Sequence, residues 1–226
     1  MPRDDDRQFA PATERNRQSI LEVLREVLPA EGAVLEVSSG TGEHAVFFAP
    51  HLAPRQWIPS DPNPIARASI AAWRSHSPSD NLHLPLALDA REEVWPLEST
   101  STQQQRLPAE LKDLDLERYP VRAVVNINMI HISPWAASLG LFAGAGRILP
   151  EGGIVYLYGP YKQNGEHTAP SNAAFDQSLR SQNPEWGVRD LSDVVAAAQE
   201  RHFSLMKTIT MPANNLSVIF QRQPSE

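Results

Sequence analysis

Residues 34–49 read VLEVSSGTGEHAVFFA, and this stretch decides the fold. A short apolar run gives way to small residues and two glycines, Gly40 and Gly42, and then resumes with the spacing of an apolar helix. A strand, a tight glycine turn and a helix in this order bring backbone N–H groups and a helix N-terminus close to a ligand. The stretch therefore predicts a nucleotide cradle at the edge of an α/β sheet.

Alternating apolar runs around this stretch predict a β-α-β-α-β rhythm, which is typical of a parallel sheet with right-handed crossovers. The interval 91–120 interrupts the rhythm with a polar run and several prolines, and we expect a loop with at most a short helix there. Residues 204–211 and 216–221 predict a terminal hairpin. The other predicted strands are 33–37, 56–60, 82–88, 121–126 and 154–158, and the predicted helices are 14–28, 43–49, 64–73, 138–149, 173–181 and 191–201.

The composition is that of a globular protein with a small-molecule ligand. A chain of 226 residues suffices for one large α/β domain, and we expect a single domain over 1–226. The formal net charge of −7, with scattered lysines and arginines, argues against a nucleic-acid partner. Cysteine is absent, the N-terminus is charged, and no apolar run approaches membrane-spanning length. We therefore expect a cytoplasmic protein without a membrane partner, and the oligomeric state stays open.

Asp61 supplies the acid that a nucleotide cradle needs after its second strand. It follows the predicted strand 56–60 and lies 21 residues beyond Gly40, where a carboxylate can accept hydrogen bonds from two ribose hydroxyls. The alternative is that Asp61 caps the helix that begins near Pro64. Both interpretations can hold together.

The charge of the cradle distinguishes between two classes of cofactor. With Ala45 in the third position, the glycine pattern also fits the dinucleotide variant GxGxxA. Glu36, however, lies inside the first strand, where it would repel a pyrophosphate and attract the cationic amino-acid end of S-adenosylmethionine. Asp89, at the end of the predicted strand 82–88, and the terminal hairpin also favour S-adenosylmethionine over NAD.

These features together resemble the class I S-adenosylmethionine-dependent methyltransferases, a three-layer Rossmann-like α/β fold. The resemblance implies a mostly parallel seven-stranded sheet whose last strand is inserted antiparallel by the C-terminal hairpin. More narrowly, several runs resemble the DUF938 family, whose substrate the resemblance does not supply. These runs are RQFAPATERN (7–16), LEVSSGTGEHA (35–45), NINMIHISPW (126–135), GPYKQNGEHTAPSNAAFD (159–176) and NPEWGVRD (183–190).

The resemblance implies a division of labour in a site for S-adenosyl-L-methionine. Glu36, Gly40 and Gly42 would hold the methionine portion, Asp61 the ribose, and Asp89 the adenine amino group. We also expect three further residues near the cofactor, with the last one part of a lid formed by the N-terminal segment. They are Ser38, Asn126 and Asn16.

Candidate catalytic residues follow the strands 121–126 and 154–158, whose carboxyl ends should meet at the ligand. His131 has the ordinary pKa of a general base, Asn128 can hydrogen-bond an acceptor, and Tyr158 begins a loop that can cover the pocket. The alternative is structural: a lone histidine in the core, and asparagines that satisfy loop backbone. His44, His131 and His167 lack the short spacing of metal ligands, so we expect no metal.

Three functions remain open on the sequence. The first is methyl transfer from S-adenosylmethionine to a small-molecule acceptor by direct displacement, in which positioning and desolvation replace a nucleophile. The second is a non-catalytic S-adenosylmethionine-binding sensor or scaffold. The third is an NAD-dependent oxidoreductase.

Overall fold

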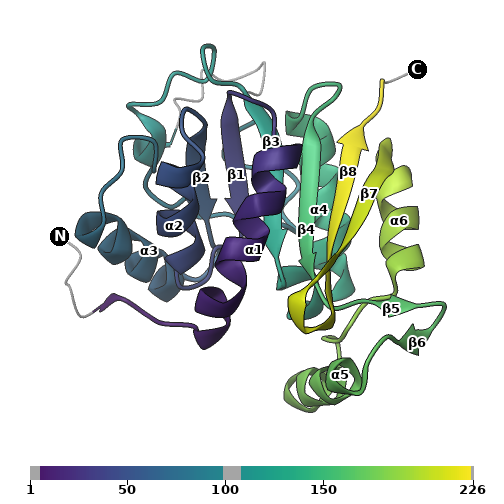
Figure 1. Ribbon diagram of the computed structural model, residues 1–226. Helices are drawn as coiled ribbons and strands as arrows, with labels where there is room; N and C mark the ends of the chain where they lie inside the picture. The colour runs from purple at the N-terminus through teal and green to yellow at the C-terminus, as the bar shows by residue number, and fades with distance from the viewer. Residues whose placement is uncertain (1–5, 99–107, 225–226) are drawn as a thin grey trace.

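A six-stranded mixed sheet forms the centre of the structure, a computed structural model that describes residues 6–98 and 108–224 (Figure 1). The strand order is β2-β1-β3-β4-β8-β7. The first four of these strands pair in parallel, and β8 lies antiparallel between β4 and β7. The strands are β1 (Ala33–Val37), β2 (Gln56–Ser60), β3 (Val121–Ile127), β4 (Ile154–Gly159), β7 (Phe203–Met211) and β8 (Asn215–Arg222).

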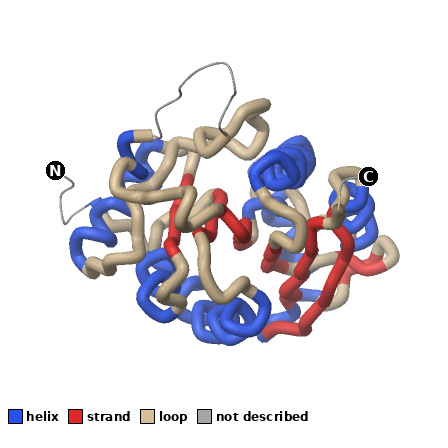
Figure 2. The backbone as a smooth tube through the Cα atoms, turned by 90° about the horizontal axis from the view of Figure 1, so that it is seen from above, coloured by secondary structure: helices blue, strands red, loops and turns tan. Residues whose placement is uncertain are grey.

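Helices cover both faces of the sheet, as Figure 2 shows. The cluster of buried apolar residues on one face joins the sheet to α1 and α2, with α3 packed beside α2. The cluster on the other face joins it to α4 and α6. The three-layer α/β fold, its mostly parallel sheet and its antiparallel C-terminal strands are thus confirmed. The helices are α1 (Pro11–Val27), α2 (Glu43–His51), α3 (Pro64–His76), α4 (Trp135–Ile148), α5 (Pro170–Gln182) and α6 (Leu191–Gln199).

The predicted strand 82–88 is wrong, and with it the count of seven strands. Only Leu82 and Leu86 form isolated bridges to the edge strand β2. The ladder starts well, because Trp57 N–H donates to Asn81 O and His83 N–H donates to Trp57 O. Pro59 and Pro85 then lack the N–H groups that would continue it, and the next bond comes from Leu86 N–H to Pro59 O.

Several predicted boundaries also shift. α1 begins at Pro11 rather than at residue 14, and α4 begins at Trp135 rather than at residue 138. The long loop after β4 contains the short antiparallel pair β5 (Lys162–Gln163) and β6 (Glu166–His167). In the loop predicted over 91–120, the described part holds the short 3-10 helix η2 (Ala109–Leu111), and 99–107 lies outside the described residues. No helix in the described ranges is long and apolar enough to cross a membrane.

Glycines on α4 allow the segment after Asp89 to pack against this helix. A Cβ at Gly144 would lie 2.0 Å from Trp95 Cε2, and a Cβ at Gly140 would lie 2.3 Å from Ala90 O. Alanine is the better helix former, but here the steric clash dominates. We expect Gly144→Ala to lower the free energy of unfolding by about 1–3 kcal/mol in urea denaturation. Gly146→Ala is the control, because its nearest contact would be 3.6 Å; equal losses in both would contradict the packing argument.

Candidate functional site

A cavity of about 550 Å³ opens where β1, β2 and β3 end, at the carboxyl edge of the parallel strands. Its volume is within the range of small-molecule sites. It is lined by Ala10, Ala12, Thr13, Asn16, Glu36, Ser38, Ser39, Gly40, Thr41, His44, Asp61, Pro62, Asp89, Ala90, Arg91, Ile127, Asn128, Met129, Ile132, Ser133, Pro134, Ala137 and Trp186.

The glycine turn between β1 and α2 forms one side of this cavity. Ser38, Gly40 and Gly42 all have positive φ angles, of 58°, 57° and 90°. A Cβ at Gly42 would lie 2.7 Å from Ile70 Cα, so this glycine lets α3 approach. A Cβ at Gly40 would meet nothing within 4 Å, and Gly40 itself lines the cavity. The two glycines therefore have different roles: Gly42 serves packing, and Gly40 leaves space for a ligand.

Asp61 lies at the end of β2 and fixes the shape of the turn. Gly40 N–H donates to Asp61 Oδ2 at 3.0 Å, and Asn63 N–H donates to Asp61 Oδ1 at 2.9 Å. The capping residue of α3 is Asn63, whose side chain accepts from Ile65 N–H at 2.9 Å. Burial raises the pKa of Asp61, and the two backbone donors oppose this shift. Asp61 thus supports the backbone on both sides without being the cap.

Glu36 is a carboxyl buried at the floor of the cavity, with 2% of its surface exposed. Trp57 Nε1–H donates to its Oε2 at 2.9 Å. Burial raises the pKa of Glu36 to about 7, although the hydrogen bond from Trp57 favours the charged form. A cation that enters the cavity would meet a carboxyl that is ready to ionise near neutral pH.

This burial makes the stability of the protein depend on pH. The folded pKa of about 7 exceeds the ordinary value of 4.5, so protonated Glu36 favours the folded state. That contribution is complete below pH 4.5 and is lost as the pH rises through about 7. Urea unfolding at about pH 9 should show the wild type about 3 kcal/mol less stable than Glu36→Gln, with little difference at about pH 5. Parallel stability curves for the two proteins would contradict this assignment.

Asp89 also lines the cavity and is held by Arg91. The Arg91 guanidinium contacts both carboxylate oxygens, with Nη2 2.6 Å from Oδ2 and Nε 3.0 Å from Oδ1. The hydrogen bonds from Arg91 lower the pKa of Asp89 below its usual value. Asp89 is therefore a fixed hydrogen-bond acceptor at the rim.

The predicted catalytic residues separate into one that reaches the cavity and two that do not. Asn128 lines the cavity at a positive φ of 65°. Tyr158 is not among the lining residues, and its hydroxyl accepts from Asn215 Nδ2 at 3.1 Å. Asn126, which we expected near the cofactor, is also outside the lining, and its Nδ2 donates to Val37 O at 2.9 Å.

His131 is fully buried and is not among the residues that line the cavity. Its ring lies 5.1 Å from that of Tyr161 in an edge-on contact, and its Nδ1 accepts from Arg189 N–H at 3.4 Å. Burial, reinforced by the Arg189 charge, lowers the pKa of His131 to about 3. The ring is therefore neutral and is not placed to contact an acceptor in the cavity. The general-base hypothesis has no geometric support.

Comparison with known families identifies the chain. Residues 7–222 match the family described as "Protein of unknown function (DUF938)". The chain belongs to the DUF938 family. The resemblance stated from its sequence runs is thus confirmed over most of its length.

Solved structures with the same fold include S-adenosylmethionine-dependent and other methyltransferases. SibL, an S-adenosylmethionine-dependent methyltransferase in its apo form, matches with a TM-score of 0.69 at 16% identity over 94% of this chain and 56% of its own. CalO1, a methyltransferase in calicheamicin biosynthesis in its SAH-bound form, matches with a TM-score of 0.65 at 14% identity, over 91% of this chain and 54% of its own. An O-methyltransferase family 2 protein from Planctomyces limnophilus in complex with apigenin matches with a TM-score of 0.67 at 18% identity, over 98% of this chain and 62% of its own.

These identities establish a common fold and nothing finer. The DUF938 chain covers between 54% and 62% of the length of these three methyltransferases. What this chain binds therefore depends on the residues of its own cavity.

Sequence reasoning missed part of the DUF938 cavity that comes from distant segments. The N-terminal segment 8–16 contributes Ala10, Ala12, Thr13 and Asn16 to the lining. Two bonds anchor it: Gln8 N–H donates to Ser69 Oγ at 2.8 Å, and Ala10 N–H donates to Glu43 Oε2 at 2.5 Å. Asn16, which the sequence did place in a lid, lines the cavity and lies 2.9 Å from His44 Nε2. One feature of the sequence indicated Trp186: its place in the run 183–190, which resembles the DUF938 family.

Metal-binding geometry is not found in the described part of the DUF938 chain. No group of three or more histidine, aspartate or glutamate side chains there could hold an ion. His44 is half-buried at the cavity, and its loss of hydration there lowers its pKa to about 4, so its ring is neutral. His167 is not among the residues that line the cavity, and its Nε2 lies 3.3 Å from Asp176 Oδ2.

Proposed function

We propose that this DUF938 protein binds S-adenosylmethionine and transfers its methyl group to a small-molecule acceptor. One observation carries the proposal: Glu36, Gly40, Asp61 and Asp89 come from separate elements and line a single cavity of ligand size. These are the residues to which the family resemblance assigned the cofactor. A ligand with a cationic end, a ribose and an adenine matches these residues in chain order. Glu36 and Gly40 would hold the cationic end, Asp61 the ribose and Asp89 the adenine.

The chemistry of the donor set fits the cofactor. Asp61 uses one lone pair on each oxygen for Gly40 N–H and Asn63 N–H, which leaves further acceptor positions for two ribose hydroxyls. Glu36 would ionise against an ammonium group, and the absent side chain of Gly40 leaves space beside the turn. Asp89, fixed by Arg91, would accept from an exocyclic amine.

The reaction requires alignment more than acid–base catalysis. When bound, S-adenosylmethionine would supply a methyl group activated by its sulfonium sulfur, with the carbon–sulfur electrons remaining on sulfur and the acceptor's proton passing to solvent. The protein's part is to hold the acceptor in line and to exclude water. Asn128 is the described polar side chain best placed for this, at the end of β3.

Calorimetric titration with S-adenosylhomocysteine, with NAD in parallel, tests the cofactor class. We expect S-adenosylhomocysteine to bind with a Kd in the range of about 1–100 μM, typical of cofactor sites, and NAD not to bind. Because ionised Glu36 attracts the ligand's ammonium group, binding should tighten about tenfold between about pH 6 and about pH 8. The variant Glu36→Gln should lose this pH dependence. Absence of binding, or binding of NAD alone, would refute the proposal.

A second candidate function is non-catalytic binding of the same ligand, as a sensor or scaffold. It is favoured by the positions of His131 and Tyr158, both of which lie outside the cavity lining. A panel of small acceptors incubated with S-adenosylmethionine separates the two functions. Formation of S-adenosylhomocysteine that depends on an acceptor supports the enzyme, and tight binding without turnover across the panel supports the sensor.

A further inference from the structure

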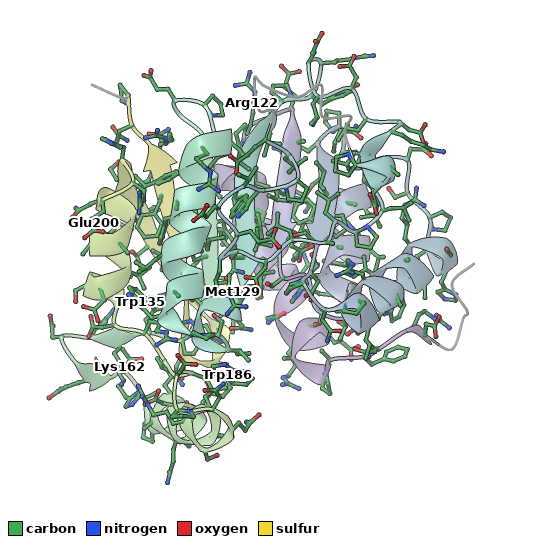
Figure 3. The ribbon with its side chains drawn as sticks, turned by 180° about the vertical axis from the view of Figure 1, so that it is seen from behind. Arg122, Met129, Trp135, Lys162, Trp186 and Glu200 are labelled. Carbon is green, nitrogen blue, oxygen red and sulfur yellow. The ribbon has the colours of Figure 1, made fainter. Side chains whose placement is uncertain are left out.

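Two loops form the part of the cavity that the assigned cofactor residues leave free. The β3–α4 loop comprises residues 128–134, and the α5–α6 loop comprises residues 183–190. Met129 and Trp186, labelled in Figure 3, come from these two loops and line the same cavity. The lining residues from the two loops and the adjoining strand end are Ile127, Asn128, Met129, Ile132, Ser133, Pro134 and Trp186.

This wall contains no ionisable side chain. Its hydroxyl is already engaged, because Ser133 Oγ donates to Met129 O at 2.7 Å. A charged group moved from water against this wall would lose hydration without gaining a partner. The ionisable lining residues all lie elsewhere, on the N-terminal side of β3 in the chain: Glu36, His44, Asp61, Asp89 and Arg91.

Arg189 holds the two loops together. Its Nε donates to Ile130 O at 2.9 Å, and its Nη2 donates to Ser133 O at 2.6 Å and to Glu185 O at 2.9 Å. A second tie is backbone to backbone, from Gly187 N–H to His131 O at 2.9 Å. The guanidinium is thus used on backbone carbonyls rather than offered to an anionic ligand.

Asn128 lies beside His131 and Gly159. His131 Nδ1 accepts from Arg189 N–H, so the neutral ring carries its proton on Nε2. A Cβ at Gly159 would lie 2.5 Å from that Nε2 and 3.1 Å from Asn128 Oδ1, so both atoms face the bare side of Gly159. His131 Nε2 has no hydrogen-bond partner among the described residues, so it does not engage Asn128 Oδ1, and the Asn128 amide, whose N–H₂ can donate, lines the cavity.

We propose that the acceptor is an uncharged, largely apolar small molecule whose reacting oxygen accepts a hydrogen bond from Asn128, and that Arg189 is the positioning residue of this subsite. This inference rests on the proposed function, since it uses the space beside the cofactor residues. The apolar wall provides affinity, and Asn128 provides orientation.

The test uses two aromatic probes of equal ring size on protein saturated with S-adenosylhomocysteine. The first is 2-naphthol, which is uncharged, and the second is the anion naphthalene-2-sulfonate. We expect 2-naphthol to bind at least about tenfold more tightly than the sulfonate, from the cost of desolvating an unpaired charge. Asn128→Ala should weaken 2-naphthol about fivefold, the value of one hydrogen bond.

Arg189→Lys tests the positioning role, because lysine keeps the charge but loses the planar fork. We expect 2-naphthol affinity to fall about tenfold while the Kd of S-adenosylhomocysteine changes less than about twofold. Arg147→Lys is the matched control, since Arg147 is a partly exposed arginine whose guanidinium binds Glu98, a residue outside both loops. Equal weakening of both ligands would show a general structural role and overturn the positioning role.

Ile132→Glu keeps the test decisive if Arg189→Lys fails to fold. Ile132 lines the cavity but is 41% exposed, so a glutamate there can be tolerated. We expect it to abolish 2-naphthol binding and to leave S-adenosylhomocysteine bound, whereas Leu139→Glu, at a 39% exposed position outside this cavity, changes neither. Tighter binding of the sulfonate, or binding of neither probe, overturns the inference alone. Failure of S-adenosylhomocysteine to bind overturns the proposed function and the inference with it.

Discussion

Replacing Asp61 with alanine should weaken the binding of S-adenosylhomocysteine by about 100-fold or more, because two hydrogen bonds to a carboxylate are each worth about 1.5–3 kcal/mol. The loss has a second source in the shape of the site. Asp61 Oδ2 accepts from Gly40 N–H, so the variant also releases the turn that the ligand approaches. Calorimetry at a fixed pH measures the affinity directly.

The same substitution has a measurable cost in stability. The N–H groups of Gly40 and Asn63 lose their acceptor, and we expect the free energy of unfolding to fall by about 1–3 kcal/mol. Asp61→Asn is the matched control, since its Oδ1 can still accept from Asn63 N–H while its amide repels the other donor. It should lose affinity with a smaller loss of stability. If either variant unfolds more easily yet binds as tightly as wild type when folded, Asp61 has only a structural role.

The fold was predictable wherever a local pattern has one physical outcome. The apolar run, glycines and apolar helix at 34–49 fix a strand, turn and helix, and the carboxyl ends of parallel strands meet at one edge. The prediction of a strand at 82–88 was wrong because the outcome depends on the neighbouring strand and not on the segment alone. Its apolar composition suits a strand, but Pro85 faces a neighbouring strand that has Pro59, a pairing that no single-segment pattern contains.

In the candidate site too, residues placed by local sequence patterns were predictable, and a residue placed by contacts between distant segments was not. Glu36 lies in β1 and Gly40 just after it, Asp61 follows β2, and Asp89 follows the segment 82–88 that runs beside β2. The sequence could therefore place them together, and all four line the cavity. The position of His131 depends on three-dimensional packing: Tyr161, Gly159 and Arg189 surround the ring, which does not line the cavity. Residue type made it a candidate base, whereas its surroundings, which are distant in sequence, make it neutral.

Gly42→Ala and Gly40→Ala should separate folding from binding within one turn. The change at Gly42 is expected to lower the free energy of unfolding by about 3 kcal/mol, since a positive φ of 90° costs about 1 kcal/mol for an L-residue and the clash adds about 1–3 kcal/mol. The clash is with Ile70 Cα at 2.7 Å, a backbone atom that cannot move without shifting α3.

At Gly40 the expected effects are reversed. Its Cβ would meet no protein atom within 4 Å, so only the cost of the positive φ, about 1 kcal/mol, applies to stability. The added methyl would take space beside the turn that a bound ligand needs, and we expect S-adenosylhomocysteine affinity to fall at least about 30-fold. Urea denaturation and calorimetry on both variants give the four values. Because the two glycines are two residues apart, a loss of affinity at Gly40 without a matching loss of stability can come only from the ligand's own contact with the turn, whereas unchanged affinity would place the ligand elsewhere in the cavity.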